Sequence, residues 1–169
     1  RYQAALLAGQ ILAAARPLAE SRYGPPGDEA LTWLRQHCRM LYAEADGAKR
    51  LPLKAPAEHE PVIPPETTLV IAVLGLDGIG KPVSEAAFRS GRYAALIGKP
   101  DSEPVTPLDA ARVLTHPDGQ RKNVTGTMRF CVLLNKADDE KRSAFALELA
   151  RELNGTGLAE RTVISALGK

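Results

Sequence analysis

The sequence predicts an α/β fold with a mainly parallel sheet flanked by helices. Two apolar runs, Thr67 to Leu74 and Met128 to Leu134, lack the alternation of a half-exposed strand, which is typical of strands covered on both faces. Segments with helical spacing follow both runs, and strands that alternate with helices favour a parallel sheet. The length of 169 residues and a hydrophobic content of 44% suit a single domain with a buried core.

The first quarter of the chain predicts two helices and a strand. Tyr2 to Ala19 has apolar residues at helical spacing, and Pro17 breaks the pattern. A second helix is expected to be capped by Asp28 and to run to about His37. Met40 to Ala43 then predicts a short buried strand that ends in polar residues.

The middle of the chain predicts a loop, a strand and two helical stretches. Five prolines lie between residues 52 and 65, so this segment is expected to be an extended loop. The strand Thr67 to Leu74 leads into a glycine-rich turn, Gly75 to Gly80, and a helical stretch follows from about Ser84. Thr106 is the expected N-cap of a helix that begins with proline and continues through Leu114.

The last third predicts a strand, a long helix and a final strand. The strand Met128 to Leu134 is followed by a helix that starts at Asp138 or Asp139 and runs through Leu153. Thr162 to Ile164 completes the predicted sheet.

Composition and charge exclude several classes of function. The chain has 22 basic and 20 acidic residues and only 5% aromatic residues, which gives little basis for nucleic-acid binding. Its apolar runs are too short to span a bilayer, so no membrane contact is expected. Cys38 and Cys131 are far apart and form no Cys-x-x-Cys pair, which argues against a disulfide framework or zinc site and favours a cytoplasmic location.

Asn135, Lys136 and Asp138 follow the strand that ends at Leu134. In GTP-binding proteins an Asn-Lys-x-Asp sequence at this place lets the Asp carboxylate accept two hydrogen bonds from guanine, while the Lys stem lies over the ring. The alternative is that Asn135 closes the strand and Asp138 caps the next helix.

Glu44 and Asp46 follow the apolar run that ends at Ala43. An acidic residue at a strand end is the usual holder of Mg²⁺ in a phosphate-binding site, either directly or through water, and both side chains point to one side if the strand extends that far. In this role they also organise the attacking water. The alternative is a solvated Glu44 before a tight Asp-Gly turn.

Two further segments carry candidate residues. Gly75 to Pro82 fits the pattern G-x-x-x-x-G-K, but Pro82 replaces the required Ser or Thr, so we expect the turn to aim Asp77 and Lys81 at a site and not to cradle phosphate. His59 lies between two glutamates, which suits a pH-sensitive group or a weak metal ligand; the alternative is a structural or exposed histidine.

Several of these segments together resemble the YqeC family, accessory proteins of selenium-dependent molybdenum hydroxylases. The resemblance is carried by Glu44-Ala45-Asp46-Gly47-Ala48-Lys49, Pro52 to Pro64, Gly75 to Pro82, Glu103-Pro104-Val105-Thr106-Pro107 and Leu133 to Asp138. It implies an incomplete P-loop NTPase-like domain of three α/β/α layers over residues 1–169, with Mg²⁺ and GTP or ATP as cofactors. The implied partner is the hydroxylase or its cofactor machinery.

The resemblance also assigns the site residues. Glu44 and Asp46 occupy the position of the second nucleotide-binding motif, and Asn135, Lys136 and Asp138 occupy the guanine position. Separately, the hypothesis of a nucleotide-binding protein expects Lys54 and His59 to line the same face as Glu44 and Asp46.

Two departures from the family pattern matter. No glycine-rich loop ending in Gly-Lys-Thr-Thr precedes Glu44, so the first strand and the phosphate loop are expected to be missing and this chain to bind nucleotide poorly. The usual His-Arg-Pro stretch after Gly-Lys-Pro stands here as Ala87-Phe88-Arg89-Ser90. The alternative function is a P-loop-like scaffold without hydrolysis, which binds the hydroxylase or a cofactor precursor through the loop 52–65.

Overall fold

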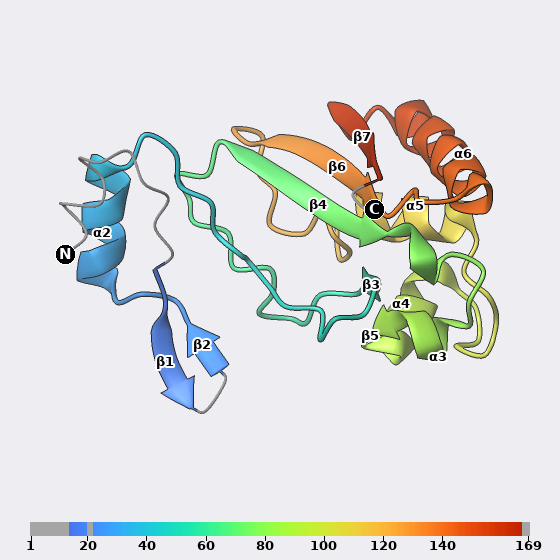
Figure 1. Ribbon diagram of the computed structural model, residues 1–169, viewed down its shortest axis with the longest axis horizontal. Coiled ribbons are helices and arrows are strands. Elements are labelled where there is room, and N and C mark those ends of the chain that lie inside the picture. The colour runs from blue at the N-terminus through green and yellow to red at the C-terminus, as the bar shows by residue number, and fades with distance from the viewer. Residues whose placement is uncertain (1–13, 20–21, 167–169) are drawn as a thin grey trace. The chain divides into compact units, whose positions relative to one another are not determined.

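The computed structural model describes residues 14–19 and 22–166 and contains two compact units. The first unit extends to Glu44 and the second begins at Ala45. The single domain expected from the length stays a prediction. Figure 1 shows the elements of each unit.

The first unit contains a hairpin and a helix. Strands β1 (Arg16–Ala19) and β2 (Arg22–Gly24) pair antiparallel, and α2 spans Asp28–His37. The expected break of the first helix at Pro17 is confirmed, since Pro17 cannot donate a helical hydrogen bond and lies in β1. Residues 14–15 have no regular structure, so the helical pattern is wrong there, and residues 2–13 lie outside the described residues. The N-cap of α2 is Gly27, and Asp28 is the first helical residue.

The strand predicted for Met40 to Ala43 is also wrong. These residues have no regular structure, and Met40 and Tyr42 are 65% and 81% exposed. An apolar run forms a strand only when a neighbouring strand takes up its backbone hydrogen bonds. Among the described residues none pairs with this run.

The second unit is built on a parallel sheet in the order β4-β6-β7, as Figure 1 shows. Its elements are β3 (Leu53–Lys54), β4 (Leu69–Gly75), the 3-10 helix η1 (Leu76–Gly78), α3 (Val83–Ala86), β5 (Ala87–Phe88), α4 (Ser90–Ile97), α5 (Pro107–Thr115), β6 (Arg129–Asn135), α6 (Glu140–Thr156) and β7 (Arg161–Ser165). The predicted α/β class with a mainly parallel sheet is therefore confirmed, and β4, β6 and β7 lie where the sequence predicts strands.

One face of this sheet forms the core with helices α4, α5 and α6. Ala72, Leu74, Val132 and Leu134 are buried there. The other face differs from the prediction of strands covered on both sides, because Ile71, Val73 and Val163, which are apolar, are between 48% and 59% exposed. In the register, Val73 of β4 and Val163 of β7 both pair with Leu133 of the central strand β6, so they lie in one row across the sheet.

Local signals account for the helix ends. Thr106 caps α5 as predicted, since its hydroxyl accepts from Asp109 N–H at 3.2 Å and the Asp109 carboxylate accepts from Thr106 N–H at 3.0 Å. Asp139, one of the two predicted residues, caps α6. The helical stretch expected from Ser84 is interrupted, because Ala87 and Phe88 pair with β3 before α4 begins.

Candidate functional site

A buried ammonium group is the centre of the first polar cluster of the second unit. The pairing of β3 with β5 places Lys54 in the interior, where the residue is only 6% exposed. Its Nζ lies 2.9 Å from Asp46 Oδ2, 3.0 Å from Glu60 Oε2 and 2.7 Å from the Gly47 carbonyl oxygen. These three oxygens occupy all three donor positions of the ammonium, which desolvation of a buried charge requires.

Arg89 completes this cluster by binding the same carboxylate, that of Glu60. Its Nη1 and Nη2 donate to the two Glu60 carboxylate oxygens at 2.7 and 2.8 Å, and Nη1 also lies 3.3 Å from the Ala55 carbonyl oxygen. A bidentate pair of this kind is stronger than a single hydrogen bond. We refer to Asp46, Lys54, Glu60 and Arg89 as the ion cluster.

The ion cluster sets the protonation of Glu60. Burial raises the pKa of this carboxyl, but the hydrogen bonds from Arg89 and Lys54, the Ala57 N–H and the charge of Lys54 outweigh burial and lower the pKa to about 2. Glu60 therefore stays ionised at neutral pH and holds both cations in place.

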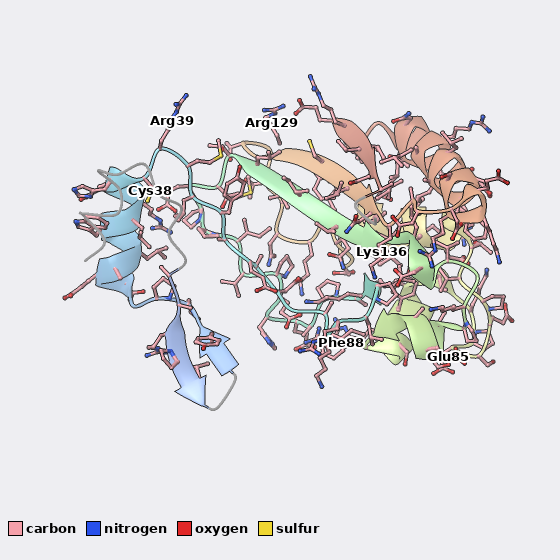
Figure 2. The ribbon with its side chains drawn as sticks, viewed as in Figure 1. Cys38, Arg39, Glu85, Phe88, Arg129 and Lys136 are labelled. Atoms are coloured by element: carbon pink, nitrogen blue, oxygen red, sulfur yellow. The ribbon has the colours of Figure 1, made fainter. Side chains whose placement is uncertain are left out.

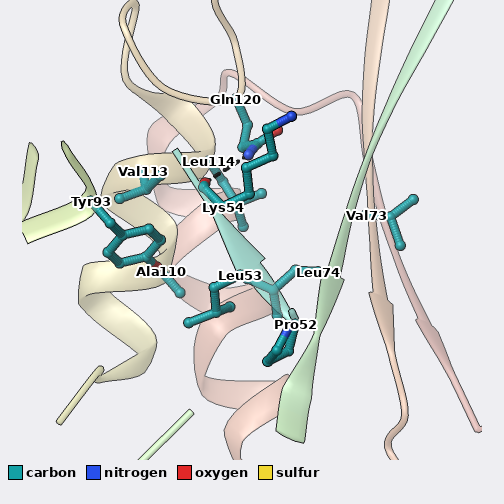
Figure 3. A pocket seen from close by; sticks show the side chains of 10 residues that line it. All are labelled: Pro52, Leu53, Lys54, Val73, Leu74, Tyr93, Ala110, Val113, Leu114 and Gln120. Atoms are coloured by element: carbon teal, nitrogen blue, oxygen red, sulfur yellow. Dashed lines mark hydrogen bonds between the residues drawn. The ribbon is translucent and has the colours of Figure 1, made fainter. Parts of the chain in front are cut away.

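Residues 120–123, which follow α5, anchor the proline-rich loop beside the ion cluster. Gln120 Nε2 donates to the Lys54 carbonyl at 2.8 Å, as Figure 3 shows. Lys122 Nζ donates to the Ala57 and Glu58 carbonyls at 3.0 and 2.6 Å, and Asn123 Nδ2 donates to the Pro61 carbonyl. The loop 52–65 is thus extended, as predicted, and held by side chains from a distant part of the chain.

A second polar cluster lies at the carboxyl ends of β4 and β6. Gly75 and Asn135 are in register there, and Lys136 Nζ pairs with Asp77 Oδ2 at 2.8 Å. Asn135 Oδ1 accepts from the Lys136 N–H at 2.9 Å. Figure 2 shows Lys136 near the end of β4. The structure thus brings together three of the predicted cofactor-binding residues, Asp77, Asn135 and Lys136.

Gly75 leaves the space that the Asp77 carboxylate occupies. A Cβ at this position would lie 2.6 Å from Asp77 Oδ1 and 2.9 Å from the Pro52 Cβ. Because no larger residue fits, the glycine determines where the carboxylate sits, and through it the Lys136 ammonium.

Asp138 follows Lys136 by two positions in the sequence. Its carboxylate is 3.5 Å from Arg142 Nη1, and the neighbouring Asp139 caps α6 through the Arg142 N–H. Asp138 is therefore not the helix cap, and its side chain is 30% exposed.

The turn after β4 connects the two clusters. Gly75 N–H donates to the Pro52 carbonyl at 3.0 Å, and a Cβ on Gly78 would lie 2.7 Å from the Leu53 Cγ. Lys54 follows directly in sequence. The hydrogen bond between Gly75 and Pro52 thus links two segments. One leads to Lys54 of the ion cluster, and the other leads to Asp77 of the Asp77–Lys136 pair.

The remaining predicted residues lie outside these contacts. Glu44 is exposed at the end of the first unit. The His59 side chain is 79% exposed, with Nε2 3.9 Å from Glu60 Oε1, so it does not share the buried environment of Lys54. Lys81 is exposed, and its carbonyl accepts from the Val105 N–H.

The described residues contain no group of three or more His, Cys, Asp or Glu side chains that would hold a metal ion. A cavity of about 10 Å³ beside Lys54 and Tyr93 has room for no more than one water molecule (Figure 3). A larger hollow of about 360 Å³ contains none of the predicted site residues; it is lined by Arg92, Ala95, Leu96, His116 and Asp118.

Backbone strain coincides with the two clusters. Among the described residues, five that are not glycine have a left-handed backbone: Lys49, Arg50, Arg89, Asn123 and Lys136. Each adjoins or belongs to one of the clusters. Such residues concentrate at functional sites, because the surrounding contacts must overcome their cost.

Sequence reasoning missed Arg89, Lys122 and Gln120. Each acts across 29 or more positions on the loop 52–65. Arg89 lies between two short elements, and its only signal was its place in the stretch that corresponds to the family's His-Arg-Pro. The only signal for Glu60 was its place in the motif-dense loop.

The sequence is similar to one known protein family. The family model described as YqeC protein matches residues 2–91. The Escherichia coli K12 protein called "Uncharacterized protein YqeC" is 34% identical over 120 residues, which are 70% of this chain and 47% of that protein. The chain thus spans about half the length of this relative. No solved structure matches the chain.

Proposed function

The chain belongs to the YqeC family, and from this premise we propose that it is the core of a Mg²⁺-dependent protein that binds GTP or ATP during maturation of a selenium-dependent molybdenum hydroxylase. The observation that supports this most is the cluster of Asp77, Asn135 and Lys136 at the carboxyl ends of adjacent parallel strands. Ligands of open α/β sheets bind beyond these strand ends.

In this proposal Asp138 and Asn135 select the base. The Asp138 carboxylate is partly exposed, and its Oδ2 has only a long contact, 3.5 Å, to Arg142 Nη1, so the N–H groups of a guanine edge would compete with a weak partner. The Lys136 stem would lie over the ring while its ammonium stays paired with Asp77. Lys81, on the same turn as Asp77, is exposed for contact with the ligand.

Asp46 and Glu44 are the proposed residues for Mg²⁺, and His59 is proposed to assist proton transfer. One Asp46 oxygen is paired with Lys54, which leaves a single open carboxylate oxygen on a side chain that is 18% exposed. Mg²⁺ keeps several waters and takes one or two carboxylates together with phosphate oxygens, so in this proposal the ion would be held mainly by water and phosphate. When bound, the ion would neutralise phosphate charge.

Calorimetry of the full-length protein with GTP and ATP in the presence of Mg²⁺ tests the proposal. We expect Asp138→Ala to weaken GTP binding far more than ATP binding, because only guanine donates two hydrogen bonds to this carboxylate. Asp139→Ala, which removes the adjacent helix cap, is the matched control and should affect both nucleotides equally. If the protein binds neither GTP nor ATP, the proposal is wrong. If Asp138→Ala weakens the binding of GTP and ATP equally, the site does not recognise guanine.

A second candidate function is a scaffold without hydrolysis that binds the hydroxylase or a cofactor precursor through the loop 52–65. The observation that favours it is that the loop has both buried and exposed charged side chains. Lys54 and Glu60 are paired within the ion cluster, whereas Glu58 and His59 are exposed and available to a partner. Nucleotide hydrolysis that disappears on Glu44→Gln would count against it. Loss of hydroxylase binding on His59→Ala, with nucleotide affinity unchanged, would support it.

No helix in the described part of the chain has the length and apolarity that a membrane crossing requires. A cytoplasmic location stays a prediction from the cysteine pattern, and both cysteines are free.

A further inference from the structure

The turn Ala48–Leu51 presents two adjacent cations in an unfavourable backbone conformation. The Leu51 N–H donates to the Ala48 carbonyl at 2.9 Å, and Lys49 and Arg50 have φ angles of 49° and 65°. This is the pattern of a type I′ turn, whose central positions favour Asn and Gly. Two long charged residues at these positions cost stability that the usual Asn-Gly pair would not.

The charges of this turn are not balanced within the structure. Asp46 and Glu60, the nearby carboxylates, are occupied by Lys54 and Arg89. Among the described residues, no ion pair joins Lys49 or Arg50 to a carboxylate, and both side chains are exposed. The ion cluster and this turn together contain four cations, Lys49, Arg50, Lys54 and Arg89, and two anions, Asp46 and Glu60.

An aromatic ring brings the free lysine towards Arg89. Lys49 Nζ lies 5.1 Å from the centre of the Phe88 ring, and the Arg89 guanidinium carbon lies 4.3 Å from the same centre. Phe88 is the last residue of β5 and is labelled at that strand in Figure 2. Like charges on one ring repel each other, and a bound anion would remove this repulsion.

We propose that Lys49 and Arg50, with Arg89 behind them, form a binding site for a polyphosphate group. Two adjacent ammonium and guanidinium groups suit the several oxygens of a phosphate chain, and Arg adds a planar fork of donors. In the nucleotide-binding protein proposed above, this turn would supply the phosphate contacts that the Gly75 to Pro82 turn lacks. That the bound polyphosphate belongs to a nucleotide rests on the proposed function. That the site binds a free polyphosphate does not.

The location supports this role. Residue 51 is followed by Pro52, whose carbonyl accepts from Gly75 N–H at the end of β4, where Asp77 and Lys136 lie. The basic turn and the proposed base site are thus connected through one hydrogen-bonded junction at the ligand-binding edge of the sheet.

Tripolyphosphate is the probe for this site, measured by calorimetry on the whole 169-residue chain at low salt. We expect the double variant Lys49→Asn/Arg50→Gly to lose at least about tenfold in affinity, since it removes two charged contacts. The same variant should raise Tm, by roughly 2–4 °C for each relieved residue, because Asn and Gly suit the turn. If the double variant binds tripolyphosphate more weakly but has a higher Tm, Lys49 and Arg50 serve binding and not stability.

Lys141→Asn is the matched control. Lys141 is another exposed lysine over an aromatic ring, 5.7 Å from the Phe145 centre, but it lies in ordinary helix. It should leave tripolyphosphate affinity unchanged. Lys49→Gln/Arg50→Gln removes the charges while keeping long side chains, and it should lose affinity as well.

The outcomes separate the two proposals. Tripolyphosphate that does not bind, or binds the double variant as well as the natural chain, overturns the polyphosphate site, and a fall in Tm overturns the strain on which it rests. If tripolyphosphate binds but GTP and ATP do not bind the full-length protein, the polyphosphate site stands and the nucleotide function fails. If the nucleotides bind and the double variant leaves their affinity unchanged, the nucleotide function stands and the polyphosphate site fails.

Discussion

Glu60 is the residue on which the ion cluster depends, because its one carboxylate faces both Lys54 and Arg89. Removing an anion from a buried group of charges leaves the cations without compensation, which costs more than the original attraction contributed. Arg89 adds a left-handed backbone to the same contact. The loop 52–65 therefore owes its shape to a few charges and not to its prolines alone.

We expect Glu60→Gln to lower the free energy of unfolding by about 2–3 kcal/mol, because Gln retains the volume but not the charge. Chemical denaturation measures this loss. Glu160→Gln is the matched control: Glu160 also forms a two-point pair with an arginine, Arg129, but both partners are exposed, so the loss should be much smaller. Equal losses would show that burial of the Glu60 pair contributes nothing.

The pH dependence of stability follows from the same carboxyl. Its pKa is about 2 in the folded chain and 4.5 is its ordinary value, so Glu60 contributes stability above pH 4.5 that is lost as the pH falls towards 2. Allowing for solvent screening, the loss should be about 2 kcal/mol. Acid titration of Tm should show a shallower fall in Glu60→Gln than in the natural chain. Parallel curves would contradict the assignment of this acid-sensitive stability to Glu60.

At the scale of elements, local signals predicted the ends of the long elements well. Thr106 and Pro107 mark the start of α5, and apolar runs mark β4 and β6, because capping and side-chain periodicity act within a few residues. The interruption between α3 and α4 was not predictable in this way. It depends on the pairing of β5 with β3, which begins 34 positions earlier in the chain.

The turn after β4 gives a prediction at this scale. Gly75→Ala should lower the free energy of unfolding by about 1–3 kcal/mol, since its Cβ would overlap Asp77 and Pro52. Gly91→Ala in α4 is the control: it has open space around it, and alanine favours helix, so it should stabilise by up to about 1 kcal/mol. Thermal unfolding of both variants measures the contrast. A stabilising Gly75→Ala would mean that Asp77 is not confined by this turn.

At the scale of the whole molecule, the second unit has a sheet with unlike faces. Val132 is fully buried on one face, whereas Val73 on the other is 59% exposed. A continuous apolar run does not distinguish these cases, because the run records only that no polar residue alternates with it. Which face of the sheet is buried therefore depends on where the helices pack and not on the sequence of the strands.

Threonine substitutions test this difference between the faces. Val132→Thr buries a hydroxyl and should cost about 1–3 kcal/mol, whereas Val73→Thr should change stability by less than about 0.5 kcal/mol. Denaturant titration of the two variants makes the comparison. If Val73→Thr were as costly as Val132→Thr, the face that bears Val73 would be covered in solution.

The sequence by itself determined the α/β class, the parallel strands β4, β6 and β7 and the capped helices α5 and α6, because these depend on apolar periodicity and on contacts between near neighbours. It also placed polar residues at the strand ends, and Asp77, Asn135 and Lys136 do meet there. Only the tertiary structure decided that Lys54 is buried among Asp46, Glu60 and Arg89, that Lys49 approaches Phe88, and that one sheet face is exposed. The physical reason is that charge pairing and burial depend on which distant segments meet, and no local pattern encodes that meeting.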